Sequence, residues 1–177
     1  MKRKARIPWP VMALLGIVGA VGAQETASEP KGRALALKPA QVTARAWESK
    51  ARGGWGDFPP EKVADGDLSD TSSWRAEGRG QWIRFDLEFE QSLTGIDIAF
   101  MNGAHRVYRF SLDVSADGEK WTEVKRCESD GRTAGFEAFA LNGIRARFVR
   151  IVGHGNSNDR FPEWISINEV RLRVADR

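Results

Sequence analysis

Apolar and polar residues alternate one by one in several short runs between residues 83 and 174 of this 177-residue chain. In the first run, the apolar side chains of Ile83, Phe85 and Leu87 are separated by Arg84 and Asp86. Because successive side chains of a β-strand point to opposite faces, this pattern predicts a strand with one buried face. The same period recurs in four further stretches, residues 96–100, 108–114, 148–152 and 170–174.

Residues that favour tight turns lie between these runs. Asp117 and Gly118 stand between Val114 and Trp121, and Asp-Gly is a dipeptide typical of a short β-hairpin. No window keeps a helical period for more than two turns. Several short strands at this spacing predict an all-β chain that folds as an antiparallel β-sandwich or jelly roll.

Residues 1–23 have the layout of a secretory signal peptide. Four Lys and Arg residues within the first six positions precede an apolar run that ends in small residues, and we expect cleavage after about Ala23. The apolar run is shorter than the roughly 20 residues of a membrane-spanning helix, so a membrane anchor is disfavoured. We therefore expect a secreted or periplasmic protein whose mature chain does not span a membrane.

The net charge depends on that segment. The whole chain has 27 Lys and Arg against 24 Asp and Glu, but four of the basic residues lie within residues 1–23. Without them the charge is about −1, which offers no global attraction for nucleic acid. We expect a tether over residues 24–36 and one domain over residues 37–177. Since Cys127 is the only cysteine, no intrachain disulfide can form, and stability must come from the core, a metal or both.

Five motifs occur in order along the chain, namely DGD…W, QWIRFDL, FSLDVSADGEKW, ARFVRI and INEVRL. This order resembles the discoidin or coagulation-factor type C domain and its bacterial relatives, the family 32 carbohydrate-binding modules, from about Ala36 to Val174. The stretches DGDLSDTSSWRAEGRGQWIRFDL and ARFVRIVGHGNSNDRFPEW are similar to modules appended to alginate lyases. The resemblance implies an eight-stranded, galactose-binding-domain-like jelly roll with a structural Ca²⁺ and a ligand site in its end loops. It implies no catalysis in the domain itself.

The acidic stretch VADGDLSDTSSW (63–74) can be a solvated turn, a catalytic carboxylate pair or a metal-binding loop. Ca²⁺ takes about six to eight oxygen ligands from carboxylates, carbonyls and hydroxyls. Asp65 and Asp67 offer carboxylates, and Thr71 or Ser72 offers a hydroxyl; whether Asp70 takes part stays open. The resemblance adds two carbonyls and one carboxylate from outside the loop. We therefore expect a Ca²⁺ site formed by Lys62, Asp65, Asp67, Thr71, Asn168 and Glu169.

Catalysis by these residues is disfavoured. A glycoside hydrolase holds two carboxyl groups about 5–9.5 Å apart across a cleft, whereas Asp65 and Asp67 lie in one tight turn. The only two histidines, His105 and His154, lie in no recognisable catalytic motif. Nucleophile elbows, phosphate loops and HExxH zinc motifs are absent from the sequence. We therefore expect that the protein is not an enzyme. The enzymatic alternative is a uronate lyase or hydrolase, which its reaction products would reveal.

Carbohydrate binding has better-suited residues. Sugars present hydroxyls to planar polar side chains and C–H faces to aromatic rings. The stretches ARGGWGDF, WRAEGRG, FMNGAHRVYR and GHGNSNDRFPEW carry such side chains. We expect ligand contacts from Trp55, Arg75, Asn102, His105, Arg106, Asn156, Arg160 and Trp164.

These residues also have structural interpretations. Trp55, flanked by glycines, is either an exposed ring or a lid packed on the end of the sandwich, and Trp164 is either a core residue or a platform. Galactose-binding members of the family place a histidine where this chain has Arg75. Convergence of Arg75, Arg106 and Arg160 would suit a carboxylate, because guanidinium binds one with two hydrogen bonds.

The sequence therefore predicts an exported, non-catalytic module that binds a polysaccharide or oligosaccharide through its end loops. Uronic-acid polymers such as alginate are favoured as the ligand. The alternative is a protein-interaction domain of the discoidin type, which uses the same loops against a cell-surface or periplasmic partner.

Overall fold

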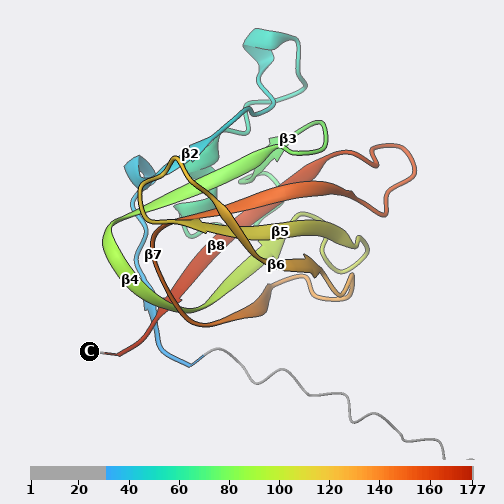
Figure 1. The fold of residues 1–177 in the computed structure, drawn as a ribbon. Helices are drawn as coiled ribbons and strands as arrows, with labels where there is room; N and C mark the ends of the chain where they lie inside the picture. Colours follow the sequence, from blue (N-terminus) through green and yellow to red (C-terminus); the bar gives the residue numbers. More distant parts are fainter. Residues whose placement is uncertain (1–30, 177) are drawn as a thin grey trace, which may run out of the picture.

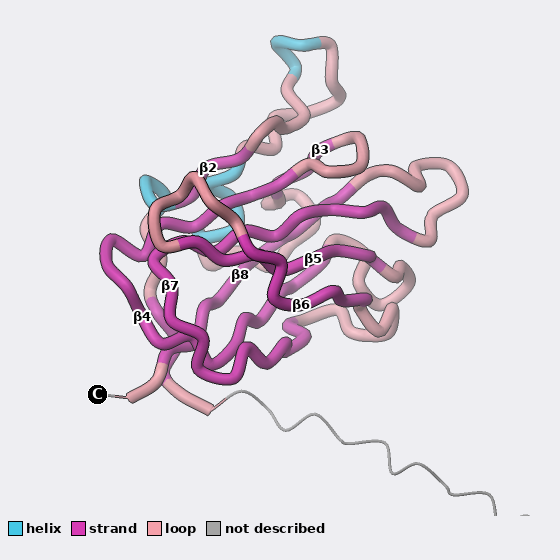
Figure 2. Tube along the Cα trace, in the orientation of Figure 1, coloured by secondary structure: helices cyan, strands magenta, loops and turns pink. Residues whose placement is uncertain are grey.

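A computed structural model describes residues 31–176 of the protein. Within this range the chain forms eight β-strands, three short 3₁₀ helices and no α-helix (Figures 1 and 2). The 3₁₀ helices are η1 (Pro39–Gln41), η2 (Lys50–Arg52) and η3 (Pro60–Ala64). The strands are β1 (Arg33–Leu35), β2 (Val42–Ala44), β3 (Trp74–Ala76), β4 (Trp82–Phe100), β5 (Tyr108–Ser115), β6 (Thr122–Glu128), β7 (Phe136–Asn156) and β8 (Ile165–Val174).

Two long strands, β4 and β7, connect the layers of the structure. The first part of β4, Trp82–Asp86, pairs with residues 148–152 of β7. Residues 95–99 of β4 pair with residues 136–140 of β7 on one side and with β8 on the other. The register is interrupted after Asp86, where Glu88 adopts a left-handed φ of 68° and the strand turns (Figure 1). Each long strand thus runs through both layers of an antiparallel sandwich, which confirms the predicted jelly roll.

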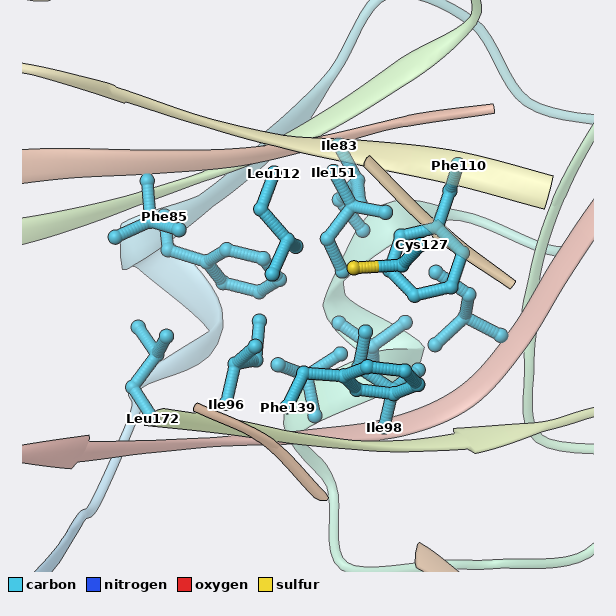
Figure 3. Close-up of a cluster of buried hydrophobic side chains, with 14 of the residues drawn as sticks. Ile83, Phe85, Ile96, Ile98, Phe110, Leu112, Cys127, Phe139, Ile151 and Leu172 are labelled. Atoms are coloured by element: carbon cyan, nitrogen blue, oxygen red, sulfur yellow. The ribbon is translucent and has the colours of Figure 1, made fainter. Parts of the chain in front are cut away.

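Figure 3 shows the apolar space between the two layers. Side chains of β4, β5, β6 and β7 on one side face side chains of β4, β7 and β8 on the other. The first group is Ile83, Phe85, Phe110, Leu112, Cys127 and Ile151; the second is Ile96, Ile98, Phe139 and Leu172. Nearly all of these residues belong to the alternating runs, so the pattern that predicted the strands also predicted the core.

The ordered domain begins earlier than expected. Residues 33–35 fall within the stretch 24–36 that we expected to be a tether, but they form β1 and pair with Leu172–Val174 of β8. A three-residue strand is too short to show an alternation, and backbone pairing with a sheet edge requires no particular side chains. The expected signal peptide and the tether up to residue 30 lie outside the described residues. No helix between residues 31 and 176 is long and apolar enough to cross a membrane.

The outer face of the β5–β7 layer is covered by arginine side chains. Asp113 points away from the core, yet only 8% of its side chain is exposed, because Arg150 lies over it. Arg150 donates from Nε to Asp113 Oδ2 at 2.8 Å, and its guanidinium stacks on the Trp121 ring at 4.3 Å. The ion pair therefore connects β5 to β7 where no further layer covers the sheet.

We expect Asp113→Ala to lower the free energy of unfolding by about 3 kcal/mol, because it leaves the half-buried Arg150 without its partner. Urea unfolding of the variant and the parent protein measures the difference. The control is Glu123→Ala, which breaks the exposed pair with Arg126 on the same face and should change stability little. Equal effects of the two substitutions would contradict this account.

Glu137, near the start of β7, is a partly buried carboxyl group. Burial raises its pKa from 4.5 to about 7, and the nearby Asp130 carboxylate adds to the rise. Its Oε2 accepts a hydrogen bond from the Asp130 N–H at 2.8 Å, whereas Oε1 is buried and has no hydrogen-bond partner within residues 31–176. The folded protein therefore binds a proton at Glu137 more tightly than the unfolded chain does. This stabilisation is complete below about pH 4.5 and is lost as the pH rises to about 7.

We expect Glu137→Gln, which keeps the shape without the charge, to remove this loss. The urea midpoint of the variant should rise relative to that of the parent protein between pH 4.5 and pH 7 and stay level beyond it. Glu119→Gln, on the exposed β5–β6 turn, is the control. A stability difference that is the same at every pH would show that Glu137 does not titrate in this range.

Candidate functional site

Three loops converge at one end of the sandwich and enclose two adjoining cavities. The first loop, residues 45–58 between β2 and β3, carries η2 and projects away from the sheets (Figures 1 and 2); we call it the arm. The second comprises residues 101–107 between β4 and β5, and the third residues 157–164 between β7 and β8. The arm and the third loop line both cavities, and the second loop lines the smaller one.

Hydrogen bonds tie the arm to β3 and to itself. The Glu48 N–H donates to the Arg75 carbonyl at 2.8 Å, and the Phe58 N–H donates to the Glu48 carbonyl at 3.0 Å. Glu48 Oε1 accepts from the Trp55 N–H at 2.8 Å. Gly54 allows this fold-back, since a Cβ there would lie 2.7 Å from Glu48 Cγ. These contacts hold the backbone at Trp55 in place, although Trp55 is 74% exposed.

An aromatic wall runs from the arm to the third loop. The rings of Trp55 and Phe161 meet edge to face with centroids 5.6 Å apart, and those of Phe161 and Trp164 do so at 6.2 Å. Asn156 shapes this loop, because its Nδ2 donates to the carbonyls of Phe161 and Trp164 and its Oδ1 accepts from the Asn158 N–H. Asn156 is buried with both polar atoms in use, so it positions the wall instead of contacting a ligand as predicted.

Arg75 and Arg106 both line the smaller cavity. Arg75 stacks on the Phe58 ring at 3.8 Å and donates from Nε to Ser73 Oγ at 2.8 Å. Arg106 donates from Nη1 to the Tyr108 hydroxyl at 3.1 Å. Within residues 31–176, neither guanidinium forms an ion pair with a carboxylate.

The environment of Arg75 is unfavourable for its charge. Burial lowers the pKa of its guanidinium, and the like charge of Arg106 acts in the same direction, whereas Glu48 and Asp70 oppose the change. Arginine nevertheless stays protonated, so two positive charges lie beside one cavity, and Glu48 is the carboxylate that lines it with them. An anionic group that entered would find several N–H donors.

The two cavities share one border. The smaller has a volume of about 120 Å³ and the larger about 440 Å³. Both are lined by Glu48, Trp55, Phe161 and Trp164. Guanidinium groups beside aromatic rings suit a ligand that carries a carboxylate and a flat apolar face. The geometry is therefore that of a recognition site for a polar, planar ligand.

Four of the eight predicted ligand residues meet here, namely Trp55, Arg75, Arg106 and Trp164. Three others do not line either cavity. Asn102 is exposed in a left-handed turn with φ 53°, and its N–H donates to Asp70 Oδ1 at 3.3 Å. His105 is exposed beside it, and Arg160 stacks on the outer side of the wall, 5.1 Å from the Phe161 ring centroid.

Sequence reasoning missed Glu48, Met101 and Ser166 as cavity residues. Glu48 reaches the site only because the arm folds back on it, a tertiary contact that leaves no local pattern. Met101 follows the buried end of β4, and Ser166 lies between two buried residues of β8. In the sequence both look like ordinary strand positions. Phe161 lies in the stretch GHGNSNDRFPEW, which we expected to contribute ligand contacts. Nothing in the sequence indicates that its ring contacts the Trp55 ring.

The acidic loop lies against β8. Glu169 is buried, and its Oε2 accepts a hydrogen bond from the Gly66 N–H at 3.2 Å. Burial raises the pKa of Glu169 to about 7, and the negative charge of Asp65 contributes to the rise. Asp65 Oδ2 also accepts from Ser72 Oγ and lies 3.6 Å from Lys62 Nζ. Two predicted metal ligands, Asp65 and Glu169, thus face each other across the loop.

The remaining predicted ligands are arranged differently. Asp67 points to solvent, where its Oδ1 accepts from the Ser69 N–H at 2.8 Å, and this hydrogen bond lowers its pKa. Thr71 Oγ1 shares a hydrogen bond with Ser69 Oγ. The Asn168 side chain donates from Nδ2 to Asp70 Oδ1 at 3.0 Å, while its Oδ1 is buried without a partner in the described part of the chain.

These groups can be tested for their fit to Ca²⁺. Among residues 31–176 no cluster of three or more Asp, Glu, His or Cys side chains could hold a metal. The loop and β8 instead offer the carboxylates of Asp65 and Glu169, backbone carbonyls, and the Asn168 Oδ1, which has no hydrogen-bond partner among the described residues. These donors are all oxygens, which suit a hard cation such as Ca²⁺, and a cation near Glu169 would offset the repulsion from Asp65. The donor set therefore fits calcium, and the calcium site stays a prediction.

Comparison with known proteins identifies the fold family. Residues 43–170 match the F5/8 type C domain. A comparison with curated proteins found no match. Among solved structures, the CBM32 module of AlyQ in complex with 4,5-unsaturated mannuronic acid is 34% identical with a TM-score of 0.65, and the match covers 74% of this chain and 92% of that one.

Two further structures are similar. A truncated AlyQ with CBM32 and alginate lyase domains is 31% identical with a TM-score of 0.69, and the match covers 83% of this chain but 35% of that one. A pectin-binding carbohydrate-binding module is 25% identical with a TM-score of 0.64, and the match covers 82% of this chain and 94% of that one. The chain therefore belongs to the F5/8 type C, or discoidin, domain family and is related to the CBM32 carbohydrate-binding modules found with alginate lyases.

Proposed function

We propose that the protein is an exported, non-catalytic module that binds acidic polysaccharides, with uronic-acid polymers such as alginate as the ligand class. The observation that carries this proposal is the pair Arg75 and Arg106 in the smaller cavity, neither of which has an ion-pair partner in the described part of the chain. Export rests on the signal-like sequence of residues 1–23.

A uronate matches both halves of the site. Its carboxylate can accept hydrogen bonds from two guanidinium groups, and a C–H face of its ring can lie against the aromatic wall. A neutral sugar would offer its hydroxyl oxygens to the guanidinium groups but would not supply the opposite charge. The AlyQ module, solved with a mannuronic acid derivative, and the pectin-binding module support an acidic sugar as ligand.

One shallow site of this kind gives weak binding. We expect a Kd near the millimolar range, or roughly −4 kcal/mol, for a single sugar unit. A polymer presents the same unit many times, so rebinding raises the apparent affinity without new contacts.

We expect Arg106→Ala to weaken binding to alginate at least about tenfold, since a hydrogen bond to a charged group contributes about 1.5–3 kcal/mol. Affinity electrophoresis in gels that contain alginate, pectin, galactan or no polymer measures the change. Arg132→Ala, in the exposed β6–β7 loop, is the matched control and should keep the mobility of the parent protein.

Galactan should not retard the protein. Equal retardation of Arg106→Ala and the parent protein by alginate would remove the carboxylate contact from the proposal. No retardation in any gel would favour a protein partner, for which the 74% exposed Trp55 at the end of the arm is suited. Pull-down from envelope extract, with free oligosaccharide as competitor, then identifies that partner.

We further propose that Ca²⁺ stabilises the fold through Asp65, Glu169 and carbonyl oxygens of the acidic loop. Such an ion would join the first third of the domain to β8. Because the unfolded chain has no preformed site, the binding free energy would add to folding stability.

We expect Ca²⁺ to raise the melting temperature and EGTA to lower it, with the metal content verified by atomic spectroscopy. In Glu169→Gln this difference should shrink or disappear. Glu137→Gln is the matched control, since Glu137 is also a partly buried glutamate with a pKa of about 7 and lies outside the acidic loop. A melting temperature that EGTA leaves unchanged would exclude a structural calcium.

A further inference from the structure

We propose that the two cavities form a pair of subsites, one that prefers a negatively charged sugar unit and one that prefers an uncharged unit. The smaller takes the carboxylate of one uronate, and the larger takes a neighbouring sugar unit without a charge. The ligand class is then an acidic polysaccharide in which uronates adjoin neutral or esterified units. This inference rests on the proposed function and specifies the ligand of the same site.

The cavities adjoin each other, as the sites for neighbouring units of one chain must. Glu48, Trp55, Phe161 and Trp164 line both of them, so the two spaces border on the same four side chains. The exposed Trp55 ring lies at this shared border. A sugar chain that follows the aromatic wall out of the smaller cavity would reach the larger one.

The larger cavity is also built to contact a sugar ring. Trp47 adds a third tryptophan to Trp55 and Trp164, and the Arg52 guanidinium lies over the Trp47 ring at 4.7 Å. Its volume of about 440 Å³ exceeds that of the smaller cavity several-fold. Stacking surfaces and space together suit one or more whole sugar units.

The charges of the two cavities differ in sign. In the smaller one, Arg75 and Arg106 outnumber Glu48. In the larger one, Glu48 and Glu77 outnumber Arg52. Glu48 is held at the shared border, because its Oε1 accepts the Trp55 N–H at 2.8 Å. A second carboxylate in the larger cavity would therefore meet a net negative surround, whereas a hydroxyl or a methyl ester would not.

Such an arrangement discriminates by repulsion as well as attraction. The carboxylates of the larger cavity repel a ligand with a second negative charge there, whereas a ligand with an uncharged unit at that position meets no such repulsion. A polymer with a carboxylate on every unit can fill the smaller cavity, but its neighbouring unit then carries charge into the larger one. At an equal concentration of free uronate units, the site should therefore bind a polymer of charged and uncharged units more tightly than a fully charged polymer.

The experiment compares two polymers, alginate and polygalacturonate, each in its fully acidic form and with about half of its carboxylates methyl-esterified. Isothermal titration calorimetry gives the dissociation constant per free uronate. For the polymer that binds, we expect the half-esterified form to bind about three- to tenfold more tightly. In Glu77→Gln this preference should fall, because the acidic form gains affinity. Glu119→Gln, an identical change on the distant β5–β6 turn, should keep it.

The outcomes separate the two levels of the proposal. Equal binding of both forms, or tighter binding of the acidic form, would overturn the charge preference and leave acidic-polysaccharide binding intact. An undiminished preference in Glu77→Gln would show that Glu77 does not produce it and would also overturn the inference. If neither polymer binds in either form, acidic-polysaccharide binding itself fails, and the two-subsite inference fails with it.

Discussion

The backbone pairing of β4 with β7 is the interaction on which the rest of the structure depends. These two strands pair over three stretches that reach into both layers, and the breaks in register after Asp86 and Leu93 let the same chain serve both. Hydrogen bonds therefore continue from one layer to the other, and the apolar side chains of both layers face a single core. Every other strand attaches directly or indirectly to this pair, and so do the loops that form the site.

The site itself lies at one end of the sandwich, where β3 and the loops meet. Arg75 of β3 and Arg106 of the second loop lie beside aromatic rings, and burial and mutual repulsion both disfavour the charge on Arg75. A protein that only needed a stable loop would gain by pairing these groups with carboxylates. Their lack of ion-pair partners within residues 31–176 is therefore better explained by recognition than by stability.

The fold could be predicted from the sequence because its signal is local. Alternation around Phe85, Ile98 and Phe110 follows directly from strand geometry, and each of these side chains is buried as expected. β1 escaped prediction because three residues that pair through the backbone leave no pattern. Arg33–Leu35 could be assigned only once the edge of β8 was known.

The site was only half predictable, since it depends on how loops fold back. Residue type and loop position singled out Trp55, Arg75, Arg106 and Trp164, which line one cavity. The same reasoning grouped Asn156 with them, because an asparagine that closes a loop and one that contacts a ligand have the same sequence signature. Glu48 could not be predicted from the sequence, because its place at the border of both cavities arises from one hydrogen bond across the arm.

The arm is attached to the domain in a way that makes it exchangeable. Residues 48–58 contribute no side chain to the hydrophobic core, and their backbone is anchored mainly at Arg75 of β3, which receives the Glu48 N–H and donates to the Phe58 carbonyl. Insertions or replacements between these two anchor points would leave the packing of the sandwich unchanged. Related chains can therefore acquire new ligands through this one segment, while natural selection on the sheets continues to preserve the same scaffold.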